Sequence, residues 1–289
     1  MFGGIAKAAT TCTGMSVKLP ILAPQVQIEA LQLATKDRSY GFGRRLYRFN
    51  IAQQGYWLKF HLPQQHHAVL EMSFQAELAF YQAQRTAQPS FLLPYQLIQF
   101  AQYPELQHLA TQGEGLILAD SAAFFTDIYQ CNDINFIKQK ILIALEALDT
   151  LHQSGWIHGD LKTEHFRDHN GCCSLIDFEQ SFAKNQPISE MNATPHYMAP
   201  ELFHGTAKSM QSDLYAFGII LYEWLMHTRL QANSYQDWAV LHCQQLVLQL
   251  PPHFACFLPL LNGLTQKQYE QRFKAVFEAK NTLNNINLH

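Results

Sequence analysis

The sequence has few cysteines, no long basic cluster and no long apolar run. Its six cysteines show no C-x-x-C spacing, which excludes a dense disulfide scaffold and a cysteine zinc framework. We expect them to be reduced thiols, as is typical of a cytoplasmic protein. The formal net charge is −3 at pH 7, and the longest basic cluster is Gly43-Arg44-Arg45. A nucleic-acid partner and an anionic membrane therefore both lack electrostatic support.

A membrane-spanning segment and a leader are not indicated either. The longest apolar run, residues 214–226, is interrupted by Glu223 and is too short to cross a bilayer. Residues 1–16 carry only Lys7 as a charge, which makes a poor signal peptide. With 289 residues, 48% hydrophobic and 15% charged, the chain is expected to be one soluble, cytoplasmic catalytic unit with a large core.

The stretch from His158 to Phe178 carries the chemistry. Asp160 stands two residues before Lys162, and Asp177 closes a strand-like apolar run. Between them, Asn170-Gly171 predicts a tight hairpin, because both central residues of such a turn need positive φ. The hairpin would bring the two carboxylates to the same mouth.

This pair of carboxylates with a lysine suits phosphoryl transfer. One carboxylate accepts the proton of the attacking hydroxyl, a cation neutralises charge on the phosphoryl oxygens, and a second carboxylate holds the metal that bridges the phosphates. Asp160, Lys162 and Asp177 match these needs in that order.

Four motifs in order carry a resemblance to a known family. They are HGDLKTEH over residues 158–165, LIDF over 175–178, ATPHYMAPE over 193–201 and SDLYAFGIILYE over 212–223. Together they resemble the protein kinases, whose catalytic loop reads HRDLKxxN and whose metal loop reads DFG. The resemblance covers about residues 40–280, and the chain is identified as a member of the eukaryotic-type (Hanks-type) serine/threonine protein kinase family.

The resemblance implies an α+β, protein-kinase-like fold. A small β-rich N-lobe would carry one helix, and a larger C-lobe would be mostly helical. We expect an N-terminal extension over residues 1–24, the N-lobe over 25–118, and the hinge with the C-lobe over 119–289. Apolar residues at helical spacing predict helices over 68–87 and from Ile134 to the glycine turn at Ser154-Gly155.

In the N-lobe, the resemblance implies residues that hold ATP. Residues 39–44 would form the loop that covers the phosphates, although only Phe42-Gly43 fits the G-x-G-x-x-G pattern. Lys59 would orient the phosphates. Glu77 would hold that lysine, with Glu71 as the rival position. Residues 119–122 would then be the hinge, whose backbone groups could hydrogen-bond an adenine, and two neighbouring positions are expected to contact the nucleotide: Leu118 and Asp120.

In the C-lobe, the resemblance implies the catalytic roles. Asp160 would take the proton of the substrate hydroxyl, and Lys162 would stabilise the transferring group. Thr194 would position both of them. Asp177 would bind the metal, Mg²⁺ or Mn²⁺, together with His165. Two further positions are expected to be structural: Asp213 beneath the catalytic loop, and Arg272 as the partner of Glu201.

Three positions depart from the family pattern. Gly159 replaces the arginine that grips a phosphorylated activation segment in regulated members, so we expect no switching by phosphorylation there, for example at Ser189. Glu179 replaces the glycine of DFG, as it does in many small-molecule kinases of the wider fold. His165 replaces a metal-binding asparagine. Because magnesium prefers oxygen ligands, this change predicts weak activity or a preference for Mn²⁺.

The expected function is ATP-dependent phosphorylation of serine and threonine hydroxyls on protein substrates. Two alternatives stay open. HGD and DFE are similar to the aminoglycoside and choline kinases, which phosphorylate small alcohols, but those lack the MAPE run. A pseudokinase that binds nucleotide or acts as a scaffold is the other. It has no chemical need for the four retained positions: Lys59, Glu77, Asp160 and Asp177. The substrate and the oligomeric state are not specified.

Overall fold

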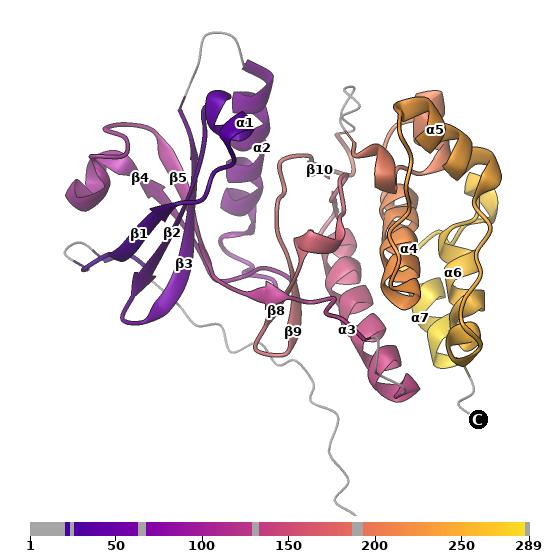
Figure 1. Ribbon diagram of the computed structural model, residues 1–289. Helices are drawn as coiled ribbons and strands as arrows, with labels where there is room; N and C mark the ends of the chain where they lie inside the picture. Colours follow the sequence, from indigo (N-terminus) through magenta and orange to yellow (C-terminus); the bar gives the residue numbers. More distant parts are fainter. Residues whose placement is uncertain (1–20, 24–25, 63–67, 129–132, 187–192, 287–289) are drawn as a thin grey trace, which may run out of the picture.

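The computed structural model describes residues 21–23, 26–62, 68–128, 133–186 and 193–286. The chain forms two lobes that are joined by the segment after strand β5 (Figure 1). A β-sheet with one long helix makes up the N-lobe, and helices dominate the C-lobe. The α+β, protein-kinase-like fold is therefore confirmed. None of the described helices combines the length and apolarity that crossing a membrane requires.

The N-lobe is built on a five-stranded antiparallel sheet with the order β1-β2-β3-β5-β4. Its strands are β1 (Glu29–Leu33), β2 (Arg44–Ile51), β3 (Gln54–His61), β4 (Tyr95–Gln99) and β5 (Glu114–Ala119). Helix α2 (Ala68–Gln84) packs against β3 and β4. It ends three residues before the predicted end. Leu22 is buried and exchanges two backbone hydrogen bonds with the Gln96 side chain, which anchors the described start of the chain on β4.

The segment expected as a phosphate-covering loop differs from the prediction. Residues Asp37–Gly41 form the short helix α1, so the expectation of a loop over residues 39–44 is wrong in its first half. The helix is held to β2 by Arg45, whose guanidinium lies 3.5 Å from the centre of the Tyr40 ring and donates a hydrogen bond to Tyr40 O. This segment lies between strands β1 and β2.

Helices make up most of the C-lobe, and the two longest, which begin at Ile134 and Met210, carry many of its buried side chains. The helices are α3 (Ile134–Gln153), α4 (Met210–Met226), α5 (Tyr235–Val240), α6 (Leu258–Leu264) and α7 (Val276–Asn284), and the short strands are β6 (Ala122–Ala123), β7 (Trp156–Ile157), β8 (Phe166–His169), β9 (Cys172–Leu175) and β10 (Phe182–Ala183). The Asp133 side chain caps α3, and Ser209 and Ser212 form a capping box at α4. Between residues 235 and 286, turns and extended segments separate the short helices.

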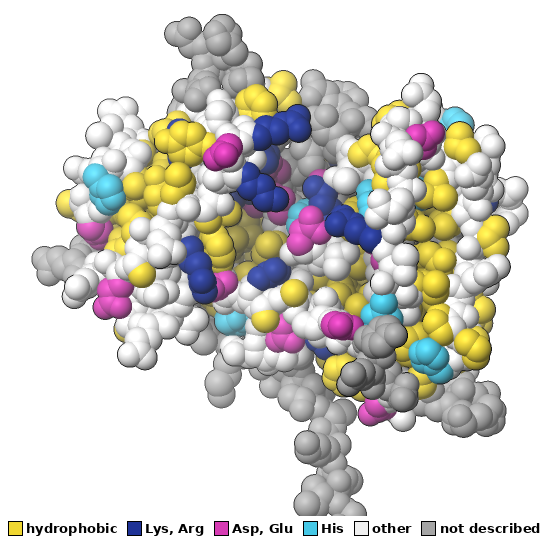
Figure 2. All heavy atoms as spheres, in the orientation of Figure 1, with side chains coloured by type: hydrophobic (Ala, Val, Ile, Leu, Met, Phe, Trp, Pro, Cys, Tyr) yellow, Lys and Arg dark blue, Asp and Glu magenta, His cyan; other side chains and the backbone are white. Residues whose placement is uncertain are grey.

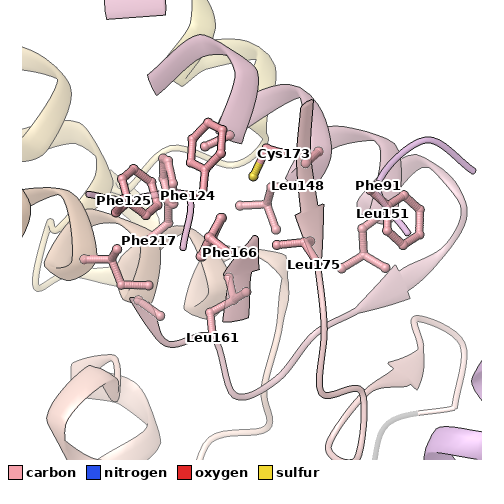
Figure 3. Close-up of a cluster of buried hydrophobic side chains, with 14 of the residues drawn as sticks. Phe91, Phe124, Phe125, Leu148, Leu151, Leu161, Phe166, Cys173, Leu175 and Phe217 are labelled. Carbon is pink, nitrogen blue, oxygen red and sulfur yellow. The ribbon is translucent and has the colours of Figure 1, made fainter. Parts of the chain in front are cut away.

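An aromatic cluster beneath the interlobe segment supports the catalytic loop (Figure 3). Phe166 of β8 packs against Phe125 and Phe217, with ring centroids 5.3 and 5.6 Å apart. Leu161 of the catalytic loop is buried in the same cluster. The hairpin of β8 and β9 turns at Asn170 and Gly171, whose φ angles are 55° and 79°, as the sequence predicts. The loop therefore rests on a packed base.

Candidate active site

Asp160 is fixed from two sides. Thr194 donates its backbone amide and its hydroxyl to Asp160 Oδ1, at 3.0 and 2.9 Å. Lys162 Nζ lies 2.9 Å from the other carboxylate oxygen, Oδ2. The three residues assigned to catalysis from the sequence are thus brought together. Burial lowers the pKa of Lys162, but the negative charge of Asp160 outweighs it and the pKa is raised above its ordinary value. A charged lysine is therefore held beside the carboxylate.

Asp213 supports the backbone under Asp160. Its two carboxylate oxygens accept the amides of His158 and Gly159, at 2.8 and 2.9 Å, and His152 Nε2 lies 3.0 Å from Oδ2. Burial raises the pKa of Asp213, but these hydrogen bonds and the neighbouring histidines hold it below its ordinary value. Asp213 anchors the catalytic loop, as the sequence predicts.

Gly159 has a conformational reason to be glycine. Its φ is +77°, and a Cβ at this position would lie 2.6 Å from Gln180 O and 3.2 Å from Lys208 Cδ. An arginine would meet both obstacles, so the space of the missing side chain is filled by the loop after Asp177 and by Lys208. Ser189, the expected site of a phosphorylation test, lies outside the described residues.

Asp177 stands at the mouth of the cleft in a strained conformation. Its φ is +66°, a left-handed value that non-glycine residues adopt rarely and mostly at functional sites. The next residue, Phe178, is buried under α2, where its ring stacks on Phe80 with centroids 3.9 Å apart. Its amide donates to Glu77 Oε1 at 3.0 Å. The position of Asp177 is therefore tied to α2.

Lys59 lies at the centre of three carboxylates. Its Nζ is 2.6 Å from Glu77, 3.1 Å from Asp177 and 2.8 Å from Glu179. Burial lowers the pKa of Lys59, yet the three negative charges outweigh burial and place it well above the ordinary value. Burial raises the pKa of Glu77, and Lys59 opposes that shift. The pairing of Lys59 with Glu77 follows the prediction, whereas the rival position, Glu71, pairs with His61 instead.

The sequence did not predict the role of Glu179. Besides Lys59, its carboxylate pairs with Arg44, the first residue of β2. The side chain of Glu179 is only 8% exposed, so this link between the lobes lies inside the cleft. A signal was present in the replacement of the DFG glycine by an acid and in the arginine directly after Gly43. Because Arg44 and Glu179 lie 135 positions apart in the chain, the sequence alone did not indicate that they pair. Gly43 itself has φ +87° and packs against Leu62 O, which a Cβ would approach to 2.3 Å.

The donor set around Asp177 fits a divalent cation. Carboxylate oxygens of Glu77, Asp177 and Glu179 lie within 4.8 Å of one another, and magnesium prefers such hard oxygen ligands. Because Lys59 Nζ lies among the same three carboxylates, a cation bound by all of them would have to take the place of the ammonium. His165 Nε2 lies 3.3 Å from Asp177 Oδ2, and its Nδ1 is buried with no hydrogen-bond partner among the described residues. Burial alone would raise the pKa of Asp177, but Lys59 and His165 hold it well below its ordinary value. Asp177 is thus suited to stay ionised.

The hinge end of the cleft is filled by polar side chains. Asp120 accepts Trp57 Nε1 at 2.8 Å through Oδ1, and Arg48 Nη2 at 2.7 Å through Oδ2. From the C-lobe side, Arg167 donates to the hydroxyl and the carbonyl oxygen of Ser121. Leu118, the other predicted contact, lies on β5 opposite Trp57. The sequence did not predict that Trp57 and Arg167 contact the hinge.

A cavity of about 270 Å³ opens in the cleft beside the catalytic loop. It is lined by Arg44, Asp160, Lys162, Asp177, Glu179, Gln180, Ala193 and Thr194. Figure 2 shows lysine, arginine and acidic side chains gathered in the hollow between the two lobes. The cavity therefore joins the predicted base, the predicted metal ligand and two cations.

A buried ion pair joins two segments of the C-lobe that are distant in the chain. Arg272 donates two parallel hydrogen bonds to Glu201, at 2.7 and 2.8 Å, and its side chain is fully buried. This pairing was predicted. It ties the MAPE run to the segment before α7.

Comparisons with known proteins agree with this geometry. A family model described as the protein kinase domain matches residues 117–275. Serine/threonine-protein kinase Nek3 of Mus musculus is 29% identical over 131 residues, which cover 43% of this chain and 25% of that protein. Serine/threonine-protein kinase AtPK2/AtPK19 of Arabidopsis thaliana is 37% identical over 136 residues, which cover 44% of this chain and 28% of that protein.

A third relative is serine/threonine-protein kinase SSK22 of Saccharomyces cerevisiae, 32% identical over 121 residues, or 34% of this chain and 9% of that protein. The chain spans less than a third of the length of these relatives. The family model, in contrast, covers more than half of this chain, including the catalytic loop, the MAPE run and helix α4. The chain belongs to the protein kinase domain family, of the eukaryotic serine/threonine type.

Proposed function

We propose that this chain transfers the γ-phosphoryl group of ATP to serine or threonine hydroxyls of a protein substrate. The observation that carries the proposal is the geometry of Asp160, whose carboxylate is oriented by Thr194 and neutralised by Lys162. A carboxylate so placed can accept the proton of an incoming hydroxyl while the lysine balances charge on the transferring group. The MAPE run beside Thr194 and the serine/threonine kinase relatives support a protein substrate over a small alcohol.

The phosphates would be bound from the N-lobe. Lys59, held by Glu77, would orient the α- and β-phosphates, and Gly43 would lie above them at the start of β2. Leu118 and Asp120 are the proposed neighbours of the base. In this scheme the N-lobe spans residues 25–118 and the hinge with the C-lobe spans 119–289, after an extension over 1–24.

A divalent cation would neutralise the phosphate charge. Asp177 would hold it, with His165 beside that carboxylate. Because imidazole nitrogen suits manganese better than magnesium, we expect transfer to be faster with Mn²⁺ than with Mg²⁺. Equal rates and equal ATP affinity in the two metals would contradict a ligand role for His165.

We also propose that the protein works in a reducing compartment, the cytoplasm. Its six cysteines show no C-x-x-C spacing and are too few for a dense disulfide scaffold. Free thiols persist where glutathione and thioredoxin keep them reduced.

The test is transfer of labelled γ-phosphate from ATP to generic proteins and to small alcohols, in Mg²⁺ and in Mn²⁺. Asp160→Asn is expected to lower the rate by about 10² to 10⁴-fold, the usual range for losing a general base. Asp237→Asn, at an exposed carboxylate on α5, is the matched control and should leave the rate unchanged. Label on an alcohol alone would assign the chain to small-molecule kinases. No transfer in either metal, with ATP still bound, would make it a binding module.

A further inference from the structure

The backbone amides of hinge residues 119–121 are already engaged by the protein itself. The Ser121 amide donates to Asp120 Oδ1 at 2.9 Å, and Trp57 Nε1 donates to the same oxygen at 2.8 Å. The Asp120 amide donates to Gly55 O at 2.9 Å, and the Ala119 amide donates to Pro94 O at 2.9 Å. A purine needs such backbone groups free, because a base edge that leaves its own polar atoms unpaired loses affinity.

Trp57 covers the roof of this end of the cleft. It lies two residues before Lys59 on β3, and alternate residues of a strand point to the same face. Residues directly opposite in neighbouring strands share that face as well, and Trp57 stands opposite Arg48 of β2 and Leu118 of β5. The indole therefore lies on the cleft side, and its bond to Asp120 places it against the hinge.

Arg167 closes the same end from the floor. It stands on β8, and its guanidinium donates to the Ser121 hydroxyl at 3.1 Å and to the Ser121 carbonyl oxygen. Arg48 reinforces the latch through two bonds to Asp120 Oδ2, at 3.1 and 2.7 Å. Burial raises the pKa of Asp120, but the bonds from Trp57 and Arg48 hold it below its ordinary value. Two arginines and one indole thus hold Asp120 and Ser121.

The phosphate end differs in kind. The cavity of about 270 Å³ there is open, and its lining includes the cations Arg44 and Lys162 but no hinge residue. Lys59 stands next to it, in contact with Asp177 and Glu179. The cavity is also lined by Asp160, Asp177 and Glu179, and each of its cations is paired with one of these carboxylates. An open space with cations that can exchange a carboxylate for a phosphate is therefore available, whereas the base end lies outside this cavity and its amides are occupied.

We propose that the cleft recognises its phosphoryl donor by the polyphosphate and not by the base, and that Trp57 and Arg167 are the residues that set this selectivity. The inference rests on the proposed function, because it concerns the donor of the same site. ATP, GTP and inorganic tripolyphosphate should bind alike, since a base that enters gains no hydrogen bond without displacing one.

The experiment measures binding of magnesium complexes of ATP, GTP and tripolyphosphate to the full chain by calorimetry. The wild type should bind all three within about threefold, because less than 1 kcal/mol separates ligands that gain no net contact. Trp57→Ala combined with Arg167→Leu should tighten ATP binding by about tenfold or more, the scale of a recovered hydrogen bond with added ring burial. Tripolyphosphate binding should stay within about twofold, since the phosphate end is unchanged.

Arg85→Leu, which removes an exposed arginine behind α2, is the matched control and should not alter the order of the ligands. If the double variant does not fold, Arg167→Leu alone is measured, and it should favour ATP by about threefold or more. A wild type that prefers ATP over tripolyphosphate by about 30-fold, or variants with no gain for ATP, would overturn the inference while leaving the proposed function intact.

A separate control keeps the two proposals apart. Lys59→Met should abolish binding of all three ligands, because the ammonium that faces the phosphates is lost. Binding that survives Lys59→Met, or a wild type that binds none of the three, would overturn the proposed function and with it the inference.

Discussion

The two walls of the cleft hold their charged groups in different ways. On the C-lobe side, Asp160 is bound by Thr194 and Lys162, and Asp213 fixes the backbone below it. On the N-lobe side, Lys59 faces three carboxylates, and one of them, Glu179, is shared with Arg44. On the catalytic side, each carboxylate oxygen of Asp160 has its own partner residue, whereas on the other side three carboxylates compete for Lys59.

The difference separates groups that must stay in place from groups that must exchange. A general base works when its orientation does not change between turnovers. A phosphate-binding lysine must leave one anion for another, so a protein carboxylate on Lys59 competes with the donor. We therefore expect Glu179 to lower the affinity for phosphates without a contact to Asp160, so that the two walls can be altered independently.

The largest expected effect concerns the C-lobe frame. Arg272→Met leaves the largely buried Glu201 carboxylate without its charged partner, which should lower the free energy of unfolding by about 3–5 kcal/mol. Lys280→Met is the control, because it breaks the more exposed ion pairs with Glu146 and Asp149 and should cost about 0–1 kcal/mol. Denaturant unfolding monitored by circular dichroism compares the two. Equal losses would show that burial of the pair is irrelevant.

The second prediction concerns the anchor of the catalytic loop. Asp213→Asn replaces a charged acceptor that two backbone amides share, and its own NH₂ group meets one of them. We expect a loss of about 2–3 kcal/mol in unfolding free energy and a fall in transfer rate, since the loop under Asp160 is no longer held. Thermal unfolding and labelled transfer are measured together. A rate that stays at the wild-type value in a folded variant would remove Asp213 from the positioning of Asp160.

The third prediction is a loss of C-lobe stability in acid. Burial lowers the pKa of His242 to about 4. The neutral ring donates from Nε2 to His196 O and accepts the Tyr215 hydroxyl at Nδ1. The unfolded histidine binds a proton near pH 6.5 and the folded one does not, so stability that is complete above pH 6.5 is lost as the pH falls toward 4. At pH 5.5 this histidine should cost about 1.4 kcal/mol. His242→Gln should flatten that part of the pH profile, and an unchanged profile would contradict the assignment.

The smallest expected effect tests the N-lobe side. Glu179→Gln removes the charge that holds Lys59 and Arg44, so MgATP and tripolyphosphate should bind about fivefold more tightly, or about 1 kcal/mol. Glu114→Gln, at an exposed position on β5, is the control and should change nothing. Calorimetry reads both. Weaker binding of the magnesium complexes alone, with tripolyphosphate unaffected in the absence of metal, would instead make Glu179 a metal ligand.

Much of the C-lobe could be predicted because its motifs carry their partners at known spacing. The turn at Asn170-Gly171 follows from a local pattern. The link from Asp213 to the catalytic loop and the pair of Arg272 with Glu201 are not local, and they could be predicted because the motifs that contain these residues resemble those of the protein kinases. The family model matches this same half, residues 117–275.

The N-lobe side of the site was less predictable for a physical reason. The bond between Trp57 and Asp120 joins residues 63 positions apart, and the pair of Arg44 with Glu179 joins residues 135 positions apart. Such pairs depend on how closely the lobes approach and on which rotamers long side chains adopt. Neither is encoded in a local pattern, so Lys59 and Glu77 were found while their competitors were not.

The stacking of Phe178 on Phe80 couples helix α2 to the loop that carries Asp177. Glu77 of α2 accepts the Phe178 amide and pairs with Lys59, so an outward movement of α2 would break both contacts. The indole of Trp156 lies edge-on to Phe80, with centroids 4.9 Å apart. The emission of Trp156, one of four tryptophans in the chain, is therefore expected to respond when this ring stack changes.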